Sequence, residues 1–178
     1  MPDRRHVHTR SIKVEAYARS DGLWDLEAAL TDVKARDFVL ATGLRPAGEP
    51  VHDMLLTVTI DTQLNVVAAK ANSLSVPYPE HCGAIAPDYS KLVGLNLLQN
   101  FRKLAIERLG GIRGCTHLTE LSAVLPTVAI QAFAGEVFKS HETPSHADEI
   151  RPSQLDRCHA LRIDGPAVAR FYPRWYRT

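Results

Sequence analysis

The sequence predicts an α+β fold in one domain, with an antiparallel sheet of about four strands and helices on one face. Apolar and polar residues alternate through residues 1–75, and apolar residues recur every three to four positions through much of 83–138. The 178 residues are 45% hydrophobic and 23% charged, which is ordinary for one compact domain. We expect mainly strands in 1–75, mainly helices in 83–138, and a loop and tail in 139–178.

The first two predicted strands form a hairpin. Residues 12–19 alternate strictly between apolar and polar side chains, and the alternation resumes over 24–30. Between them, Asp21-Gly22 offers the positive φ that a tight turn needs.

The third predicted strand carries the cleanest alternation. It covers 52–60, follows the breaker-rich loop 43–50, and turns at 61–63 into a fourth strand over 64–71. His52 then shares the inward face with the apolar residues. His52 is either a hydrogen-bonded histidine of the core or a ligand of a metal ion.

The helical half contains two predicted helices. Apolar residues recur from 92 to 109, and Gly110-Gly111 ends that helix. The second runs over 118–133, starts near Cys115, and carries Pro126, which predicts a kink. The aromatic residues of the tail carry too much apolar area for solvent, so we expect the tail to pack back onto the domain.

Composition excludes several classes of protein. Lys and Arg number 21 against 20 for Asp and Glu, so we expect no nucleic acid and no membrane partner. No apolar run reaches membrane-spanning length, and the start lacks the apolar core of a signal peptide. We expect a cytoplasmic protein. There, three reduced thiols favour metal binding or catalysis over disulfides.

Each cysteine stands beside a histidine. The three steps are E-H-C-G at Cys82, G-C-T-H-L at Cys115, and D-R-C-H-A-L at Cys158. Thiolate and imidazole are preferred ligands of transition metals. A cysteine in the first turn of a helix also favours the thiolate, which fits Cys115. His117 is a lower-ranked ligand, because helix neighbours that share a face lie three or four residues apart. The alternative is that each cysteine is a small buried core residue with no role in metal binding or catalysis.

Part of the chain resembles the NifU/IscU-like scaffold proteins for iron-sulfur clusters. P-V-H-D-M-L-L-T-V-T-I-D, H-C-G-A-I-A and R-G-C-T-H-L-T-E follow the order of the motifs of that fold across residues 50–134. The resemblance places His52, Cys82 and Cys115 on three ligand positions, whereas Pro50 and Gly114 replace two others. It therefore implies one zinc ion held by these three residues rather than a cluster. The fourth ligand would be His117, Cys158 or His159.

The whole chain also resembles a bacterial family of domains of unknown function. The shared motifs are R-S-D-G-L-W-D, G-C-T-H-L and C-H-A-L. This resemblance implies a link with aromatic or acyl-CoA catabolism and assigns no activity.

Our leading functional hypothesis is a small metal- or thiol-dependent enzyme of the lyase or hydrolase class. It would act on a small carboxylate, aromatic or acyl-type intermediate. The expected catalytic residues are Asp53, Glu120, His159 and Arg113, with Arg113 holding a carboxylate.

Two other hypotheses stay open. One is a carrier of metal, iron-sulfur cluster or sulfur, which rests on the fold resemblance. The other is a structural subunit whose aromatic tail docks on a partner or on a second copy, as in a homodimer. We expect zinc before an iron-sulfur cluster, and no nucleotide.

Overall fold

The computed structural model describes residues 2–138, 151, 152 and 154–178, which fall into two compact units. The first unit runs to Phe138 and the second comprises 139–178. Each unit is described by itself.

A four-stranded antiparallel sheet forms the base of the first unit. Its strands are β1 (His8–Ala18), β2 (Trp24–Lys34), β5 (Pro50–Ile60) and β6 (Val66–Ser75), in the spatial order β1-β2-β5-β6. This meander confirms the predicted sheet. The β1–β2 turn uses a left-handed Gly22 with φ of 82°, which is the conformation that the Asp21-Gly22 pair predicts.

A small hairpin interrupts the meander. It consists of β3 (Phe38–Leu40) and β4 (Gly43–Arg45), which lie between β2 and β5 in the chain and pair only with each other. The Thr42 hydroxyl donates to the carbonyl of Pro77 at 2.7 Å, which ties the hairpin turn to the segment after β6.

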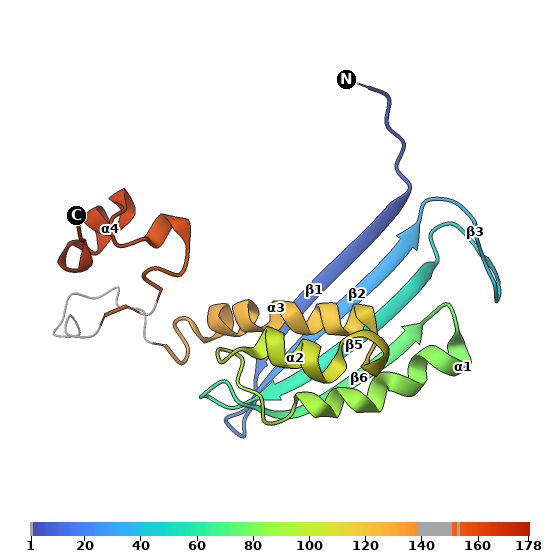
Figure 1. The fold of residues 1–178 in the computed structure, drawn as a ribbon, viewed down its shortest axis with the longest axis horizontal. Helices are drawn as coiled ribbons and strands as arrows, with labels where there is room; N and C mark the ends of the chain where they lie inside the picture. Colours follow the sequence, from blue (N-terminus) through green and yellow to red (C-terminus); the bar gives the residue numbers. More distant parts are fainter. Residues whose placement is uncertain (1, 139–150, 153) are drawn as a thin grey trace. The chain divides into compact units, whose positions relative to one another are not determined.

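The helices cover one face of the sheet (Figure 1). They are α1 (Pro79–Cys82), the 3-10 helix η1 (Gly83–Leu92), α2 (Phe101–Leu109), the 3-10 turn η2 (Gly111–Arg113), and α3 (Thr116–Phe133). The longest helix, α3, packs on β1, β2 and β5, while η1 packs on β6. Helix α2 packs against α3 and η1.

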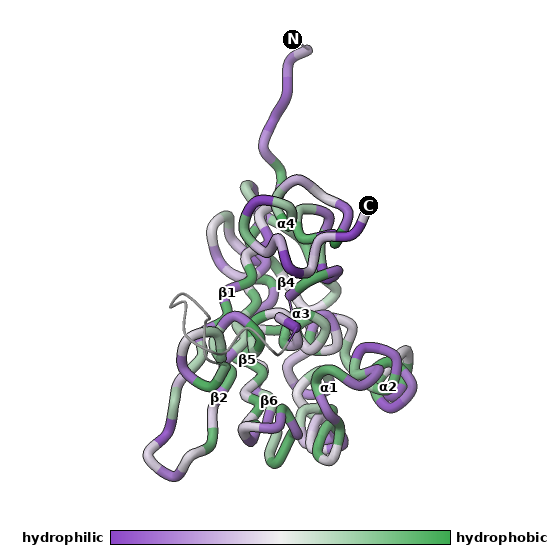
Figure 2. Tube along the Cα trace, turned by 90° about the vertical axis from the view of Figure 1, so that its left-hand side faces the viewer, coloured by the Kyte–Doolittle hydropathy of each residue, from purple (hydrophilic) through white to green (hydrophobic). Residues whose placement is uncertain are grey.

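The core lies between these two layers, which Figure 2 shows from the side with α1 and α2 beside the sheet. Leu26, Ala28 and Leu30 of β2 are fully buried and alternate with residues that are only partly buried. The inward residues of β5 continue this apolar face, and they meet the buried residues of α3. The alternation therefore assigns the strands correctly because only one face of the sheet is covered.

The first predicted helix is wrong over its first half. Gly94 and Asn100 both have positive φ, at 82° and 53°, and 93–100 is irregular. The amide of Leu97 donates to the carbonyl of Leu64. Leu95 and Leu97 are thus buried by pairing with the segment that enters β6, not by a helical face.

The second predicted helix is confirmed, and it continues through Pro126. Pro126 has no amide hydrogen to donate to the carbonyl of Ser122, and its ring crowds the preceding turn. Arg102 of α2 donates to the carbonyl of Ala123 at 2.7 Å.

The second unit has short helices: η3 (His159–Leu161), α4 (Pro166–Phe171) and η4 (Pro173–Trp175). Leu155 and Val168 are buried, whereas Phe171 is 63% exposed. Residues 139–150 and 153 of the expected loop and tail lie outside the described residues, and the packing of the tail on the domain stays a prediction.

Among the residues that the structure describes, no helix has the length and apolar character needed to cross a membrane.

Candidate functional site

A row of polar side chains crosses the inward face of the sheet where its apolar surface ends. Arg10 of β1 pairs with Asp32 of β2, and Asp32 pairs with His52 of β5. The next row holds Leu30 opposite Met54, both buried in the core. Strand register therefore places three groups able to carry charge side by side at the border of the core.

Helix α3 lies over this row of side chains and contributes two more polar residues. His117 lies in its first turn, and Glu120 follows one turn later on the same side. Tyr89 of η1 is fully buried, and its hydroxyl accepts from the amide of Cys115 at 3.0 Å and bonds the Cys115 carbonyl at 2.8 Å. This clamp fixes the start of α3, and with it the position of His117.

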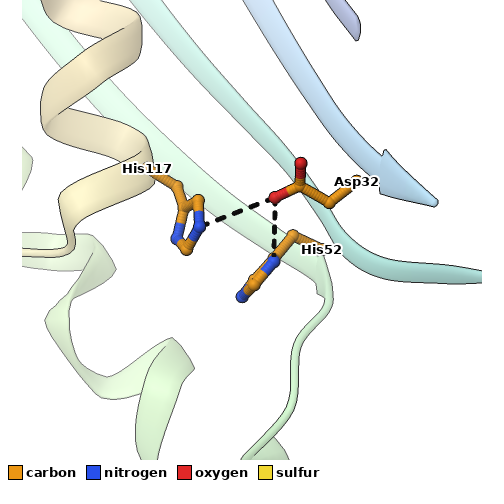
Figure 3. A group of neighbouring side chains, drawn as sticks. All are labelled: Asp32, His52 and His117. Carbon is orange, nitrogen blue, oxygen red and sulfur yellow. Dashed lines mark hydrogen bonds and ion pairs between the residues drawn. The ribbon is translucent and has the colours of Figure 1, made fainter. Parts of the chain in front are cut away.

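Asp32 is the centre of the site and is only 3% exposed. Its Oδ1 accepts from Nε of Arg10 at 2.8 Å and lies 3.1 Å from Nε2 of His8. Its Oδ2 accepts from Nη2 of Arg10 at 2.8 Å and lies 3.0 Å from Nδ1 of His52. Nε2 of His117 points to the same Oδ2 from 3.6 Å, which is too long for a hydrogen bond (Figure 3).

Two opposing influences set the ionisation of Asp32. Burial alone would raise the pKa of this carboxyl, because a low dielectric disfavours charge. The hydrogen bonds and positive charge of Arg10, helped by His52 and His117, outweigh burial and lower the pKa to about 2. Asp32 is therefore an anion at neutral pH.

The two imidazoles are neutral at the same pH. Burial lowers the pKa of His52, and the neighbouring His117 lowers it further against the opposing effect of Asp32. Burial and then the charge of Arg10 lower the pKa of His117. The ring centroids lie 3.8 Å apart, so two uncharged rings and one carboxylate share the site.

These three side chains have the composition and spacing of a metal-ligand set. One ligand atom from each lies within 4.8 Å of the others. A metal at about 2.0–2.2 Å from each ligand holds neighbouring ligand atoms roughly 3–3.5 Å apart, close to the observed separations from Oδ2. Two imidazoles and a carboxylate suit zinc and other first-row metals. Arg10 and His8 contact the carboxylate from outside, as supporting partners of a metal ligand do.

The structure brings together three of the residues expected from the sequence. His52 and His117 both point to Asp32, and Glu120 accepts from Nη1 of Arg10 at 2.5 Å. Helical spacing made His117 a lower-ranked ligand, because only partners along its own helix were considered. Its partners in the structure lie on the strands of the sheet.

Cys115 is half-buried next to the site, on the other side of His117. Its Sγ lies 3.8 Å from Nδ1 of His117, whereas Nε2 of that ring faces Asp32. The ligand group found among the described residues does not contain Cys115. The thiol can therefore interact with Nδ1 of His117, but it does not lie on the Nε2 side of the ring that faces Asp32.

The other expected residues lie elsewhere in their units. Cys82 ends α1 and packs against the core, and Asp53 follows His52 in β5 and so points to the opposite face of the sheet. Arg113 is exposed on η2. Cys158 and His159 are exposed in the second unit. Neither Cys82 nor Cys158 belongs to the ligand group seen in the described residues, and their roles as ligands stay predictions.

Sequence reasoning missed Asp32, Arg10 and His8. A signal for Asp32 existed, because the inward series Leu26, Ala28, Leu30 reaches Asp32 when the alternation is extended by one step. Placing Arg10 beside it requires the β1–β2 register, which the position of the Asp21-Gly22 turn sets.

Comparison with known proteins gives a family and no activity. Neither a curated protein nor a solved structure matches the chain, so the likeness to the NifU/IscU fold has no support from a neighbour. Residues 8–131 match DUF2889, a family described as proteins of unknown function, and that match contains every residue of the site described above. The chain therefore belongs to the DUF2889 family.

Proposed function

We propose that this protein is a metal-dependent enzyme of the lyase or hydrolase class, with Asp32, His52 and His117 as ligands of one divalent ion. The observation that supports it most is the convergence of Nδ1 of His52 and Nε2 of His117 on the same carboxylate oxygen. That oxygen already accepts from Arg10, and the second imidazole stands too far away to donate. An ion among the three would satisfy both nitrogens at once.

Zinc is the metal that we propose for this donor set. Nitrogen and oxygen donors favour zinc or another first-row ion over an iron-sulfur cluster, which needs thiolates. Three protein ligands leave an open coordination position, and in that position zinc can polarise a carbonyl or lower the pKa of water. A small carboxylate, aromatic or acyl-type compound remains the proposed substrate class.

Metal analysis of the full chain tests this proposal. Wild-type protein that has been stripped and incubated with zinc should hold one ion per chain after desalting. His52→Ala and His117→Ala should each weaken zinc binding by at least about tenfold, since each removes a ligand. His81→Ala is the matched control, because His81 is an exposed histidine on α1 outside the site. Equal zinc retention in all four proteins would contradict the proposal.

A thiol enzyme is the second candidate function, and the contact of Cys115 with His117 favours it. The order Sγ of Cys115, Nδ1 and Nε2 of His117, and Oδ2 of Asp32 is that of a nucleophile, a base and an orienting carboxylate. In such a reaction His117 takes the thiol proton while sulfur bonds to an acyl carbon. The leaving group departs with that proton, and water then releases the acyl group.

Alkylation separates the two candidates. A nucleophilic Cys115 should react with iodoacetamide near pH 6 much faster than an ordinary thiol, and His117→Ala should abolish that advantage. Exposed Cys158 provides the internal reference in the same sample. If Cys115 reacts more slowly than Cys158 at every pH, the thiol mechanism is wrong.

A further inference from the structure

The inference concerns an ion pair at the solvent-exposed edge of the site. Nη1 of Arg10 donates to Oε2 of Glu120 at 2.5 Å, and the pair joins β1 to α3 beside His117. The two side chains are 34% and 42% exposed, whereas the side chain of Asp32 is 4% exposed. The pair therefore lies at the boundary between solvent and the buried carboxylate.

Arg10 has one nitrogen free of Asp32. Nε and Nη2 hold the two oxygens of Asp32, which fixes the guanidinium plane and directs Nη1 toward Glu120. A guanidinium so fixed is preorganised for a carboxylate, because the donor is already aligned and strongly charged. In this structure the carboxylate in that place belongs to the protein itself.

The charge of the site favours an anion. A divalent ion at the three ligands and Arg10 would contribute three positive charges, against two negative charges from Asp32 and Glu120. The sum is +1, and it becomes +2 when Glu120 turns into solvent. A metal ion at the three ligands would therefore attract an anionic group to the position that Glu120 occupies.

We infer that the site takes a substrate with a carboxylate group, which binds Nη1 of Arg10 in place of Glu120 while the substrate's reacting end faces the metal. This inference rests on the proposed metal-dependent function. Arg10 then has the role that the sequence suggested for Arg113. Glu120 holds the donor in position while the site is empty.

Binding of benzoate to the zinc-loaded full chain tests the inference, with benzamide as the uncharged analogue. Glu120→Gln removes the competing carboxylate and should tighten benzoate binding roughly two- to fivefold, the range expected for release of an exposed ion pair. Benzamide binding should not change. Glu107→Gln on α2 is the control, since it makes the same change of charge at an exposed residue paired weakly with Lys103 at 3.9 Å.

Zinc content, measured on the same samples, separates the possible failures. Wild-type protein that holds no zinc overturns the proposed function and this inference with it. If zinc is bound but Glu120→Gln leaves benzoate affinity unchanged or lower, only the inference is overturned. An equal gain in Glu107→Gln also overturns it, because the effect would then come from net charge alone.

Discussion

Asp32 is the residue on which the site depends. Among the described residues it is the only buried one with a charged side chain, and it is held by Arg10, His8 and His52. A buried charge is tolerated only when it is paired, so we expect these contacts to be a condition of folding.

Removal of Arg10 should therefore cost stability. In Arg10→Leu, Asp32 keeps only histidine partners, and we expect the free energy of unfolding near pH 7 to fall by about 1–3 kcal/mol, discounted because Arg10 is partly exposed. Urea denaturation of metal-free protein measures the change. Arg19→Leu is the comparison, since its partners Asp21 and Asp25 lie nearer the surface, and it should cost clearly less stability than Arg10→Leu. Equal costs would show that Asp32 does not need Arg10.

The two site histidines should make metal-free protein sensitive to mild acid. Their pKa values are lowered by folding from the ordinary 6.5, so below that pH the unfolded chain binds protons more readily than the folded one. Their contribution is complete above pH 6.5 and is lost as the pH falls through the folded pKa values. The Asp32 carboxyl, with pKa lowered from 3.8 to about 2, adds a second loss below pH 4.

Urea denaturation at a series of pH values checks this expectation. The free energy of unfolding of wild type should decline between about pH 6.5 and 5, and the double variant His52→Gln, His117→Gln should decline less over that interval. A decline of the same slope in both proteins would mean that other groups cause it.

At the scale of elements, α3 matters because its first turn delivers His117. The buried Tyr89 hydroxyl holds that turn through the amide and carbonyl of Cys115 and through Thr119, whose hydroxyl lies at 2.8 Å. The helix is thus anchored by η1, an element that contributes no side chain to the metal-ligand group.

Tyr89→Phe should reveal this anchoring. The variant leaves polar groups near Cys115 without their partner, and we expect a loss of about 1–3 kcal/mol in the free energy of unfolding. Zinc affinity should fall as well, because His117 loses its fixed position. Tyr17→Phe, at a tyrosine that is 47% exposed, should change neither quantity. Unchanged zinc affinity in a destabilised Tyr89→Phe protein would show that α3 is positioned by other contacts.

The elements themselves could be predicted largely from hydrophobic periodicity. In β2, burial follows the alternation, because only one face lies against the core, whereas in β5 the outward Thr57 and Thr59 are buried as well. Residues 93–100 could not be predicted in this way: Leu92, Leu95 and Leu98 have helical spacing, but Leu98 is 54% exposed and the backbone bonds to the strand entrance instead. A local pattern does not show a competing tertiary partner.

The site was only half predictable for a related reason. His52 and Glu120 could be proposed from residue type and position, while their partners Asp32 and Arg10 depend on register between strands. The three Cys/His pairs were chosen because their members are neighbours in the sequence, and their roles as ligands stay predictions. Cys158-His159 lies in the second unit, and the nitrogen of His117 that faces Cys115 is not the one that faces Asp32.

At the scale of the whole molecule, the first unit contains both the core and the site. Within the described residues, the hydrogen-bond and ion-pair partners of Asp32 lie between positions 8 and 117, and the family match ends at 131. The second unit has its own small core around Leu155 and Val168.

A fragment of residues 1–138 should therefore fold and bind zinc. Its thermal unfolding should be cooperative, and its zinc affinity should lie within about threefold of that of the full chain, since no ligand is removed. Circular dichroism and a competitive zinc titration measure the two quantities. A fragment that aggregates, or that folds but holds no zinc while the full chain does, would show that the site needs the second unit.

Cobalt(II) uptake by the full chain tests the central claim most directly, because visible absorption bands report both the coordination and the ligands of the ion. We predict one cobalt per chain, bands that are lost in His52→Ala and His117→Ala, and no sulfur-to-cobalt charge-transfer band. Cobalt uptake that survives both histidine substitutions, or a strong charge-transfer band that disappears in Cys115→Ser, would contradict a centre built from Asp32, His52 and His117.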